Sequence, residues 1–240
     1  MTINEILSST EHRPWDLPAD KWKFYQEWND AVFMHWQVEL NELKKFVPHE
    51  LEIDLFDGKP WVSVVAFSME KIRPKNLPSF PPISNFDEVN IRTYVRLNGK
   101  TGVYFLSIEA GTGLSCMVAK SISELPYRYS KIRRSENQFQ SQNTEFMDKL
   151  DIEFAIRAEL NVKTELDKWL TERYALFQDA GKFINKFEIH HLEWPFNEIR
   201  LKKVVMSYVS SSHKCNTDKN LVDLNQLGFG KEIFVARFNA

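Results

Sequence analysis

One short stretch of the chain places polar side chains at regular spacing. Residues 89–96 read VNIRTYVR. Side chains alternate between the two sides of a strand, so Asn90, Arg92, Tyr94 and Arg96 share one face. An inward arginine is costly unless a carboxylate or a ligand anion pairs with it. The row is therefore either a solvated outer face or the polar wall of a binding site.

The surroundings of Arg92 favour a binding site. The predicted partner strand, 102–111 (GVYFLSIEAG), has no strongly polar face, so Arg92 would stand in a mixed interior. The proline-rich segment 73–86 precedes the row, and loops of this length are usually functional or mobile. We therefore predict that Asn90, Arg92 and Tyr94 line a cavity and that Arg92 binds a carboxylate-like group.

A second polar segment is PYRY, residues 126–129. Its alternation puts Tyr127 and Tyr129 on one face and Arg128 on the other. This pattern fits a core strand that carries tyrosines. It also fits a phenol that donates a hydrogen bond into the cavity, so Tyr127 is both a ligand-binding candidate and a catalytic candidate.

Two further pairs of residues are candidates. Glu172 and Arg173 end a predicted helix. They are either surface charges or groups of the site. In the site, Arg173 would be a second cation, and Glu172 would be the partner of Arg92 and a catalytic candidate. His190 and His191 are neighbours, and neighbours on a strand face opposite ways. Because they cannot then share a metal ion, we expect no metal site. We also expect one of the two histidines to face the interior, and we predict that His190 contacts the ligand.

Composition excludes several classes of protein. The chain has 240 residues, a net charge of −2 and no basic stripe, so we expect no nucleic-acid partner. No apolar run reaches membrane-spanning length, and the N-terminus does not resemble a secretory signal. The two cysteines, Cys116 and Cys215, are far apart, as is usual in a reduced cytoplasmic protein. The motifs GxGxxG, GxxxxGK[ST], HExxH and GxSxG are absent, and we expect no cofactor.

Turn residues and periodicity outline the elements that position these groups. Asn98-Gly99 joins strands 89–97 and 102–111 in a predicted hairpin. Further hairpins are predicted about Asp57-Gly58 (54–70) and about Asp179-Ala180-Gly181 (174–194). Residues 22–36 are predicted as one long strand or a pair of strands. Other predicted strands are 126–134, 151–160, 198–210 and 232–238, with a loop or hairpin at 137–151. Helices are predicted in 38–47, 115–125 and 164–173, the last capped by Thr164.

About ten strands and three or four short helices make an α+β chain that is mainly β. We predict one domain, 1–240, with 1–20 as an N-terminal arm, built as a closed or nearly closed antiparallel barrel with helices packed on it. The exposed strand 232–238 could pair across a homo-oligomer.

An ordered set of segments resembles the bacterial DUF2071 (YqjF-like) family from about residue 12 onward. These segments are HRPWDLP, AVFMHWQVELNELKKFVPHELEIDLFDGKPWVSVVAF, VNIRTYVRLNGKTGVYFLSIEA, LPYRYSKI, LTERYALF and EIHHLEWPF. The family has no established function. It is similar in fold to acetoacetate decarboxylase, so the resemblance implies a β-barrel around a buried pocket.

The resemblance also bears on chemistry. Acetoacetate decarboxylase forms an imine between its substrate and a lysine of lowered pKa that follows a proline. Tyr127 follows Pro126 here, and a phenol cannot form an imine. Lys120 and Lys131 lie nearby, but neither is an obvious substitute. An acidic pocket residue of the decarboxylase falls near Asn90, where the charge is lost.

Three functions compete at this point. The first is a small-molecule binding protein that holds an organic acid through Arg92, without a Schiff-base lysine. The second is a lyase, decarboxylase-like enzyme or hydrolase on a small carbonyl compound, with Tyr127 or a histidine as acid or base. The third is a structural or partner-binding protein with a filled barrel, in which large apolar side chains pack against Tyr94.

Overall fold

The computed structural model describes residues 2–181, 183–208 and 235–239, and these form 13 strands and five short helices. The strands are β1 (Phe24–Gln37), β2 (Glu52–Ile53), β3 (Trp61–Pro74), β4 (Phe86–Leu97), β5 (Lys100–Ala110), β6 (Tyr127–Tyr129), β7 (Lys131–Ser135), β8 (Gln138–Asn143), β9 (Asp148–Leu160), β10 (Ala175–Ala180), β11 (Phe183–Glu188), β12 (Phe196–Ser207) and β13 (Val235–Asn239). The helices are α1 (Ile3–Ser8), α2 (Leu40–Leu43), α3 (Pro81–Ser84), α4 (Gly113–Ser123) and α5 (Glu165–Thr171).

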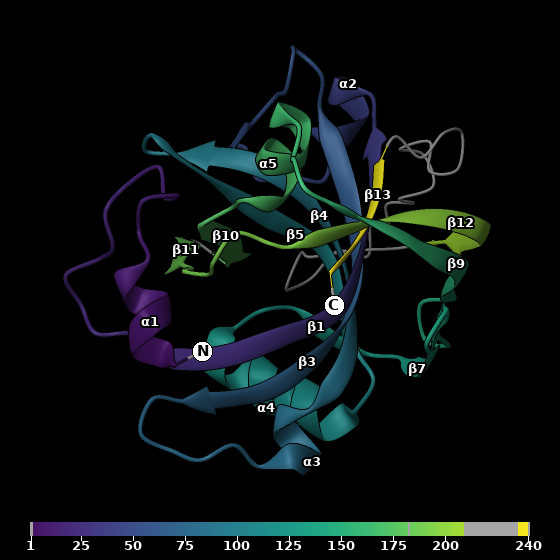
Figure 1. Ribbon diagram of the computed structural model, residues 1–240, viewed down its shortest axis with the longest axis horizontal. Coiled ribbons are helices and arrows are strands. Elements are labelled where there is room, and N and C mark those ends of the chain that lie inside the picture. The colour runs from purple at the N-terminus through teal and green to yellow at the C-terminus, as the bar shows by residue number, and fades with distance from the viewer. Residues whose placement is uncertain (1, 182, 209–234, 240) are drawn as a thin grey trace.

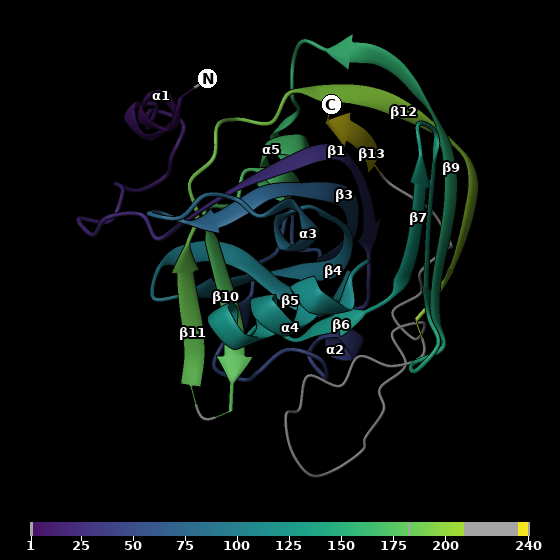
Figure 2. The same cartoon turned by 90° about the horizontal axis from the view of Figure 1, so that it is seen from below.

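All strands belong to one strongly curved sheet. Its order is β11-β10-β5-β4-β3-β1-β13-β12-β9-β8-β7, with β2 on β4 and β6 on β5. The pairs are antiparallel except β5 with β10 and β5 with β6. The sheet curls so that β7, β9 and β12 come round to lie across from β3 and β4 (Figures 1 and 2). The predicted mainly β barrel with a few short helices is confirmed.

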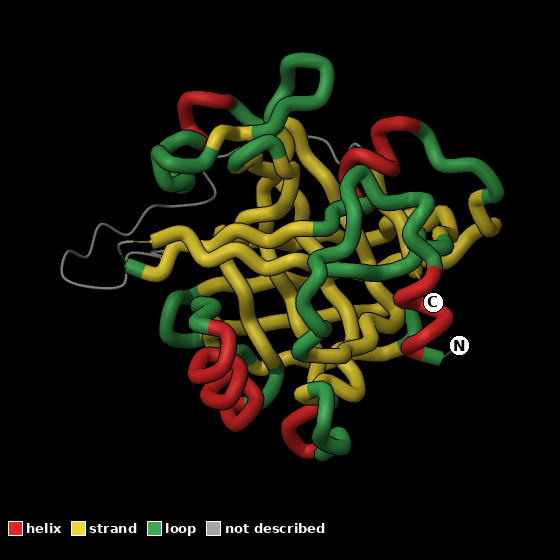
Figure 3. Tube along the Cα trace, turned by 90° about the vertical axis from the view of Figure 1, so that its left-hand side faces the viewer, coloured by secondary structure: helices red, strands yellow, loops and turns green. Residues whose placement is uncertain are grey.

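The helices lie at the margins of the sheet, and two of them matter for the site (Figure 3). Helix α4 lies beside β5 and β6 (Figure 2). Leu170 of α5 is in one buried apolar cluster with Tyr94 of β4. These helices therefore cover one face of the central strands.

The two faces of β4 have different surroundings. Val89, Ile91 and Val95 belong to the largest apolar cluster, together with residues of β8 and β9 such as Phe139 and Phe154. Tyr94 belongs to a separate cluster, with Leu125 and Leu170. The alternation of the strand thus divides the interior into two layers, and the polar row faces the layer beneath the helices.

Most of the predicted local elements are present. The hairpin of β4 and β5 turns at Asn98 (φ 52°) and Gly99 (φ 78°), both in the left-handed region that such a two-residue turn requires. The hairpin of β10 and β11 turns at Gly181 (φ 69°). Thr164 caps α5 through a capping box with Asp167. The segment 137–151 contains β8 and the start of β9.

Several predictions of pairing were wrong. Asp57 and Gly58 do form a tight turn, but only Phe56 and Lys59 bridge across it, and β2 pairs with β4 instead of β3. The predicted strand 126–134 is two strands, because β6 joins β5 whereas β7 joins β8. Long-range pairing decided both cases.

Two further differences concern the ends of elements. The predicted helix ending at Val47 ends at Leu43, and tighter i to i+3 hydrogen bonds follow, such as Phe46 N–H to Leu43 O at 3.0 Å. Strand β13, predicted as an open edge within 232–238, lies between β1 and β12, so both of its edges are paired. Residues 232–234 of that prediction lie outside the described residues, as does Cys215.

Candidate functional site

The polar row of β4 is buried. Asn90 and Tyr94 are fully buried, and Arg92 keeps an exposed fraction of 5%. Arg96, the fourth member, is different, because its side chain is 45% exposed and pairs with Asp54 at 2.5 Å. Asn90, Arg92 and Tyr94 therefore form an interior wall, and Arg92 is the one of the three that solvent reaches.

A β-bulge determines what stands beside Arg92. In the pairing with β5, Ile91 lies opposite Ser107 whereas Arg92 lies opposite Phe105, so Leu106 is an extra residue. The bulge puts Phe105 on the row of Arg92 and Ser107 on the other face. Simple alternation would have kept Phe105 and Ser107 together. The site is consequently more apolar around the arginine than the sequence suggests.

A buried carboxyl group extends the row by one step. Glu88 is 1% exposed, and it accepts hydrogen bonds from Tyr127 Oη at 2.9 Å and from Asn90 Nδ2 at 3.1 Å. Burial raises the pKa of Glu88 to about 7, against the opposing effects of Asn90, Tyr127 and Arg92. Burial likewise raises the pKa of Tyr127 well above its usual value. Tyr127 is therefore a neutral hydrogen-bond donor, whereas Glu88 exchanges a proton near neutral pH.

Arg92 is a buried cation with incomplete pairing. Its Cζ lies 5.6 Å from the ring centroid of Phe33, and its Nε has no hydrogen-bond partner. Burial lowers the pKa of Arg92, while Tyr94 and Glu88 oppose this effect. With a pKa of about 7, Glu88 is ionised in only about half of the molecules at neutral pH. The guanidinium group thus lacks a permanent counter-ion, as an anion site requires.

A chain of hydrogen bonds fixes Tyr94. His35 Nδ1 and Ser63 Oγ are 2.6 Å apart, Ser63 Oγ and Tyr94 Oη are 2.5 Å apart, and Tyr94 donates to Leu170 O at 2.8 Å. Burial raises the pKa of Tyr94, with the charges of Arg92 and Arg173 acting the other way. Because strand and helix share this chain, it holds the wall of the site against α5. His35 is thus a fully buried histidine that contacts the site wall through Ser63 in this chain.

Arg173 lies near the row but is bound to another partner. Its Nη1 donates to Asp54 Oδ2 at 2.8 Å, and its Cζ lies 4.9 Å from the ring centroid of Tyr94. Its Nη2 has no hydrogen-bond partner. Burial lowers the pKa of Arg173, and the nearby charge of Arg92 acts in the same direction. Arg173 therefore adds positive potential to the site.

One interpretation of the sequence made Glu172 the partner of Arg92. In the structure, Glu172 has other partners. It pairs with Lys163 at 2.5 Å, and it accepts hydrogen bonds from Tyr174 Oη at 3.0 Å and from Trp194 N at 3.1 Å. These contacts join the start of β10 to the segment before β12. Glu172 thus fastens elements together, and its catalytic role stays a prediction.

The two histidines lie in the segment after β11, not on a strand, so their predicted opposite facing does not apply. The N-terminal arm binds His190, because Ile6 O is 2.7 Å from its Nε2 and Arg13 Nη1 is 3.3 Å from its Nδ1. His191 stacks on Tyr174 with ring centroids 4.7 Å apart. The structure therefore places His190 at the arm, and its role as a ligand contact stays a prediction.

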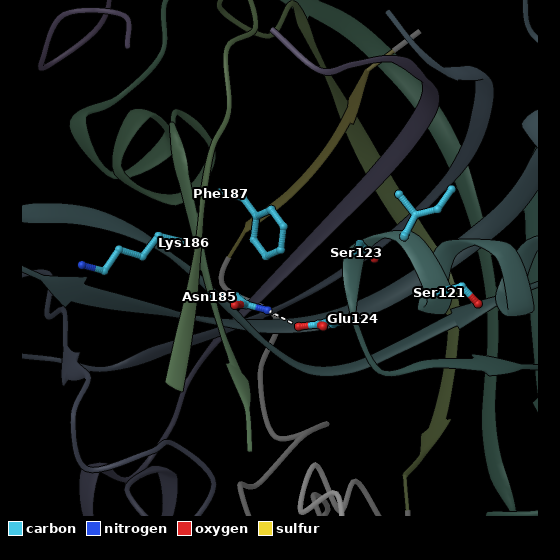
Figure 4. A pocket seen from close by; sticks show the side chains of 7 residues that line it. Ser121, Ser123, Glu124, Asn185, Lys186 and Phe187 are labelled. Carbon is cyan, nitrogen blue, oxygen red and sulfur yellow. Dashed lines mark hydrogen bonds between the residues drawn. The ribbon is translucent and has the colours of Figure 1, made fainter. Parts of the chain in front are cut away.

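A hollow of about 210 Å³ lies between the end of α4 and β11. Figure 4 shows Asn185 and Phe187 of β11 across from Ser123 and Glu124, with the Asn185 Nδ2 to Glu124 Oε2 hydrogen bond of 2.8 Å. Phe187 also packs against the cluster that contains Tyr94. The hollow thus borders the layer into which the polar row faces, but it does not include that row.

Glu88 and Ser63 belong to the site but were not among the predicted residues. Extending the alternation of β4 one step before Asn90 would have found Glu88, since residues 88, 90, 92 and 94 share a face. Ser63 carries no local signal. It is opposite Arg92 on β4 and opposite His35 on β1, which only the strand register reveals.

Over residues 2–181, 183–208 and 235–239, no three His, Cys, Asp or Glu side chains gather as metal ligands would. Within the same ranges, the structure has no helix whose length and hydropathy would allow it to cross a membrane.

Comparison with known proteins identifies relatives in sequence and in fold. Residues 25–224 match the DUF2071 family, described as an uncharacterized conserved protein. The uncharacterized protein YqjF of Bacillus subtilis (strain 168) is 35% identical over 188 residues, which cover 74% of this chain and 76% of that protein.

Solved structures with 11–12% identity share the fold. The enduracididine biosynthesis enzyme MppR, complexed with pyruvate, aligns over 94% of this chain and 88% of that chain with a TM-score of 0.56. Acetoacetate decarboxylase from Legionella pneumophila aligns over the same shares with a TM-score of 0.55. An acetoacetate decarboxylase-like enzyme from Sphingomonas wittichii RW1 aligns over 90% of this chain and 88% of that chain with a TM-score of 0.56. The protein has the acetoacetate decarboxylase-like fold, and it belongs to the DUF2071 family.

Proposed function

We propose that the protein binds a small organic acid or carbonyl compound in the layer between β4 and the helices α4 and α5, with Arg92 as the anion-binding group. The observation that carries this proposal is the buried guanidinium of Arg92. Its Nε is unpartnered, and Glu88, the carboxyl group that acts on its charge, has a pKa of about 7. A carboxylate ligand would supply the missing counter-charge. The solved structure of MppR with pyruvate supports a small acid as the type of ligand.

We propose further that no lysine forms an imine with the ligand. Tyr127 occupies the position after Pro126, and its hydroxyl group is engaged with Glu88. The side chains of Lys120 and Lys131 are exposed, which supports the same conclusion. Incubation with acetoacetate and borohydride should leave the protein mass unchanged. A stable adduct on a lysine would overturn this part of the proposal.

The binding proposal is tested by calorimetry with pyruvate, acetoacetate, lactate and 3-hydroxybutyrate. Arg92→Met keeps the length of the side chain but removes its charge, and we expect at least a tenfold loss of affinity, on the order of one charge-assisted hydrogen bond. Arg96→Met is the matched control, because that arginine is on the same strand but exposed. Equal binding by Arg92→Met, or no binding of any acid by the wild type, would refute the proposal.

A second candidate function is a lyase-like reaction on a small carbonyl compound. The Glu88–Tyr127 pair favours it, since a carboxyl group with a pKa of about 7 suits a general base. The expected activity is removal of a proton next to the carbonyl group of pyruvate, seen by NMR as exchange of its methyl protons in D₂O. Glu88→Gln should abolish this exchange while pyruvate still binds. Absence of exchange in the wild type leaves binding as the function.

The proposed location of the protein is the cytoplasm. The thiol of Cys116 is free and buried, which agrees with a reducing, cytoplasmic environment.

A further inference from the structure

The polar row of β4 contains two unpartnered atoms of opposite character. Arg92 Nε is a hydrogen-bond donor and Asn90 Oδ1 is an acceptor, and neither has a partner although both residues are at least nine-tenths buried. The amide orientation of Asn90 follows from its Nδ2, which donates to Glu88 Oε1 at 3.1 Å. A buried polar atom without a partner is rare and costly, so the pair indicates a ligand that satisfies both atoms.

The spacing of the two residues limits the size of that ligand. Asn90 and Arg92 are two residues apart on one face of a strand, which places their Cα atoms about 7 Å apart. Side chains at neighbouring positions on one face are close enough for one small ligand to contact both. A ligand whose two interacting groups are on the same or adjacent carbon atoms fits this spacing.

The chemistry of the two atoms limits the type of ligand. Arg92 Nε calls for an acceptor, which a carboxylate supplies. Asn90 Oδ1 calls for a donor, and the oxygen of a 2-oxo group cannot donate. An ammonium group could donate, but Arg92 and Arg173 both add positive charge here. The carboxyl group of Glu88 is already engaged with Asn90 and Tyr127. A further cation is therefore disfavoured. A neutral hydroxyl group next to a carboxylate meets both requirements.

We infer that the site takes a short 2-hydroxy acid in preference to a 2-oxo acid or an amino acid of the same size, with the carboxylate on Arg92 and the hydroxyl group donating to Asn90 Oδ1. This inference rests on the proposed acid-binding function. A ligand that lacks the donor leaves a buried acceptor unpaired, and binding sites discriminate strongly against such ligands.

Calorimetry on the wild-type protein tests the inference with lactate, pyruvate, alanine and propionate, which are nearly equal in size, at one pH and one ionic strength. We expect lactate to bind at least tenfold more tightly than the other three. Asn90→Leu removes the acceptor at similar volume and should bring lactate and pyruvate to within about twofold of each other. Thr93→Val is the control, because it removes a buried hydroxyl group from the opposite face of β4 and should keep the preference.

The outcomes separate the two proposals. If pyruvate binds the wild type as tightly as lactate does, the hydroxy-acid inference is overturned and acid binding stands. If none of the four binds, both are overturned. Both proposals are supported if Arg92→Met binds none of the acids and Asn90→Leu loses only the preference for lactate. Should Asn90→Leu fail to fold, the comparison of ligands on the wild-type protein decides the question.

Discussion

Replacing Glu88 by glutamine should change how the stability of the protein depends on pH. Burial raises the pKa of this carboxyl group from its ordinary value of 4.5 to about 7. Below pH 4.5 the group is protonated in both the folded and the unfolded state. Between pH 4.5 and 7 the unfolded chain releases the proton while the folded protein keeps it, so the free energy of unfolding falls as pH rises.

The magnitude follows from the two pKa values. Each pH unit between them lowers the free energy of unfolding by about 1.4 kcal/mol, so the total loss by pH 8 is about 3 kcal/mol. Glutamine does not titrate and can still accept a hydrogen bond from Tyr127. The stability of Glu88→Gln relative to the wild type should therefore increase by about 3 kcal/mol from pH 4.5 to pH 8.

Urea unfolding, followed by tryptophan fluorescence at four pH values over this range, measures the difference. Glu109→Gln is the control, because Glu109 is equally buried but pairs with Arg128 at 3.4 Å. Removing that charge breaks an ion pair, so this variant should be less stable than the wild type at pH 8. A difference between Glu88→Gln and wild type that stays constant with pH, or falls as pH rises, would refute the assignment of a raised pKa to Glu88.

Two further predictions concern the elements that position the site, and the same urea unfolding measures both. A Cβ at Gly102 would lie 2.6 Å from the backbone oxygen of Ala175, so Gly102→Ala should lower the free energy of unfolding by on the order of 2 kcal/mol or more. Gly113→Ala should cost little, because a Cβ there would have no atom within 4 Å. Equal stability of the two variants would contradict this contact. Thr164→Ala removes the side chain that caps α5 and should cost about 1 kcal/mol, and an unchanged free energy of unfolding would show that the cap is dispensable.

Local patterns in the sequence predicted the elements that depend on local geometry. Asn98-Gly99 supplies the two left-handed residues that a tight hairpin needs, and Thr164 supplies an oxygen for an otherwise unpaired backbone N–H group. The strict period of two in β4 predicted that Asn90, Arg92 and Tyr94 share a face. The apolar surroundings of that stretch indicated that the face is buried, and it is.

Pairings between distant segments were beyond the reach of such patterns. Nothing local to residues 52–53 shows that β2 joins β4, and nothing near Pro126 shows that β6 adds to β5 and brings Tyr127 to Glu88. A hydrogen bond between strands can form with any extended segment, so the partner is chosen by how the whole sheet closes.

The chemistry of the site was decided in the same way. The sequence by itself determined that an arginine shares one strand face with an asparagine and a tyrosine, and it predicted that this face is interior. Only the tertiary structure decided that Asp54 pairs with Arg173 and that Glu88 is buried deeply enough to reach a pKa of about 7. It therefore also decided that Arg92 is left short of a counter-ion. Charge balance inside a protein depends on burial and on distances between strands, and neither is encoded in the spacing of residues along one strand.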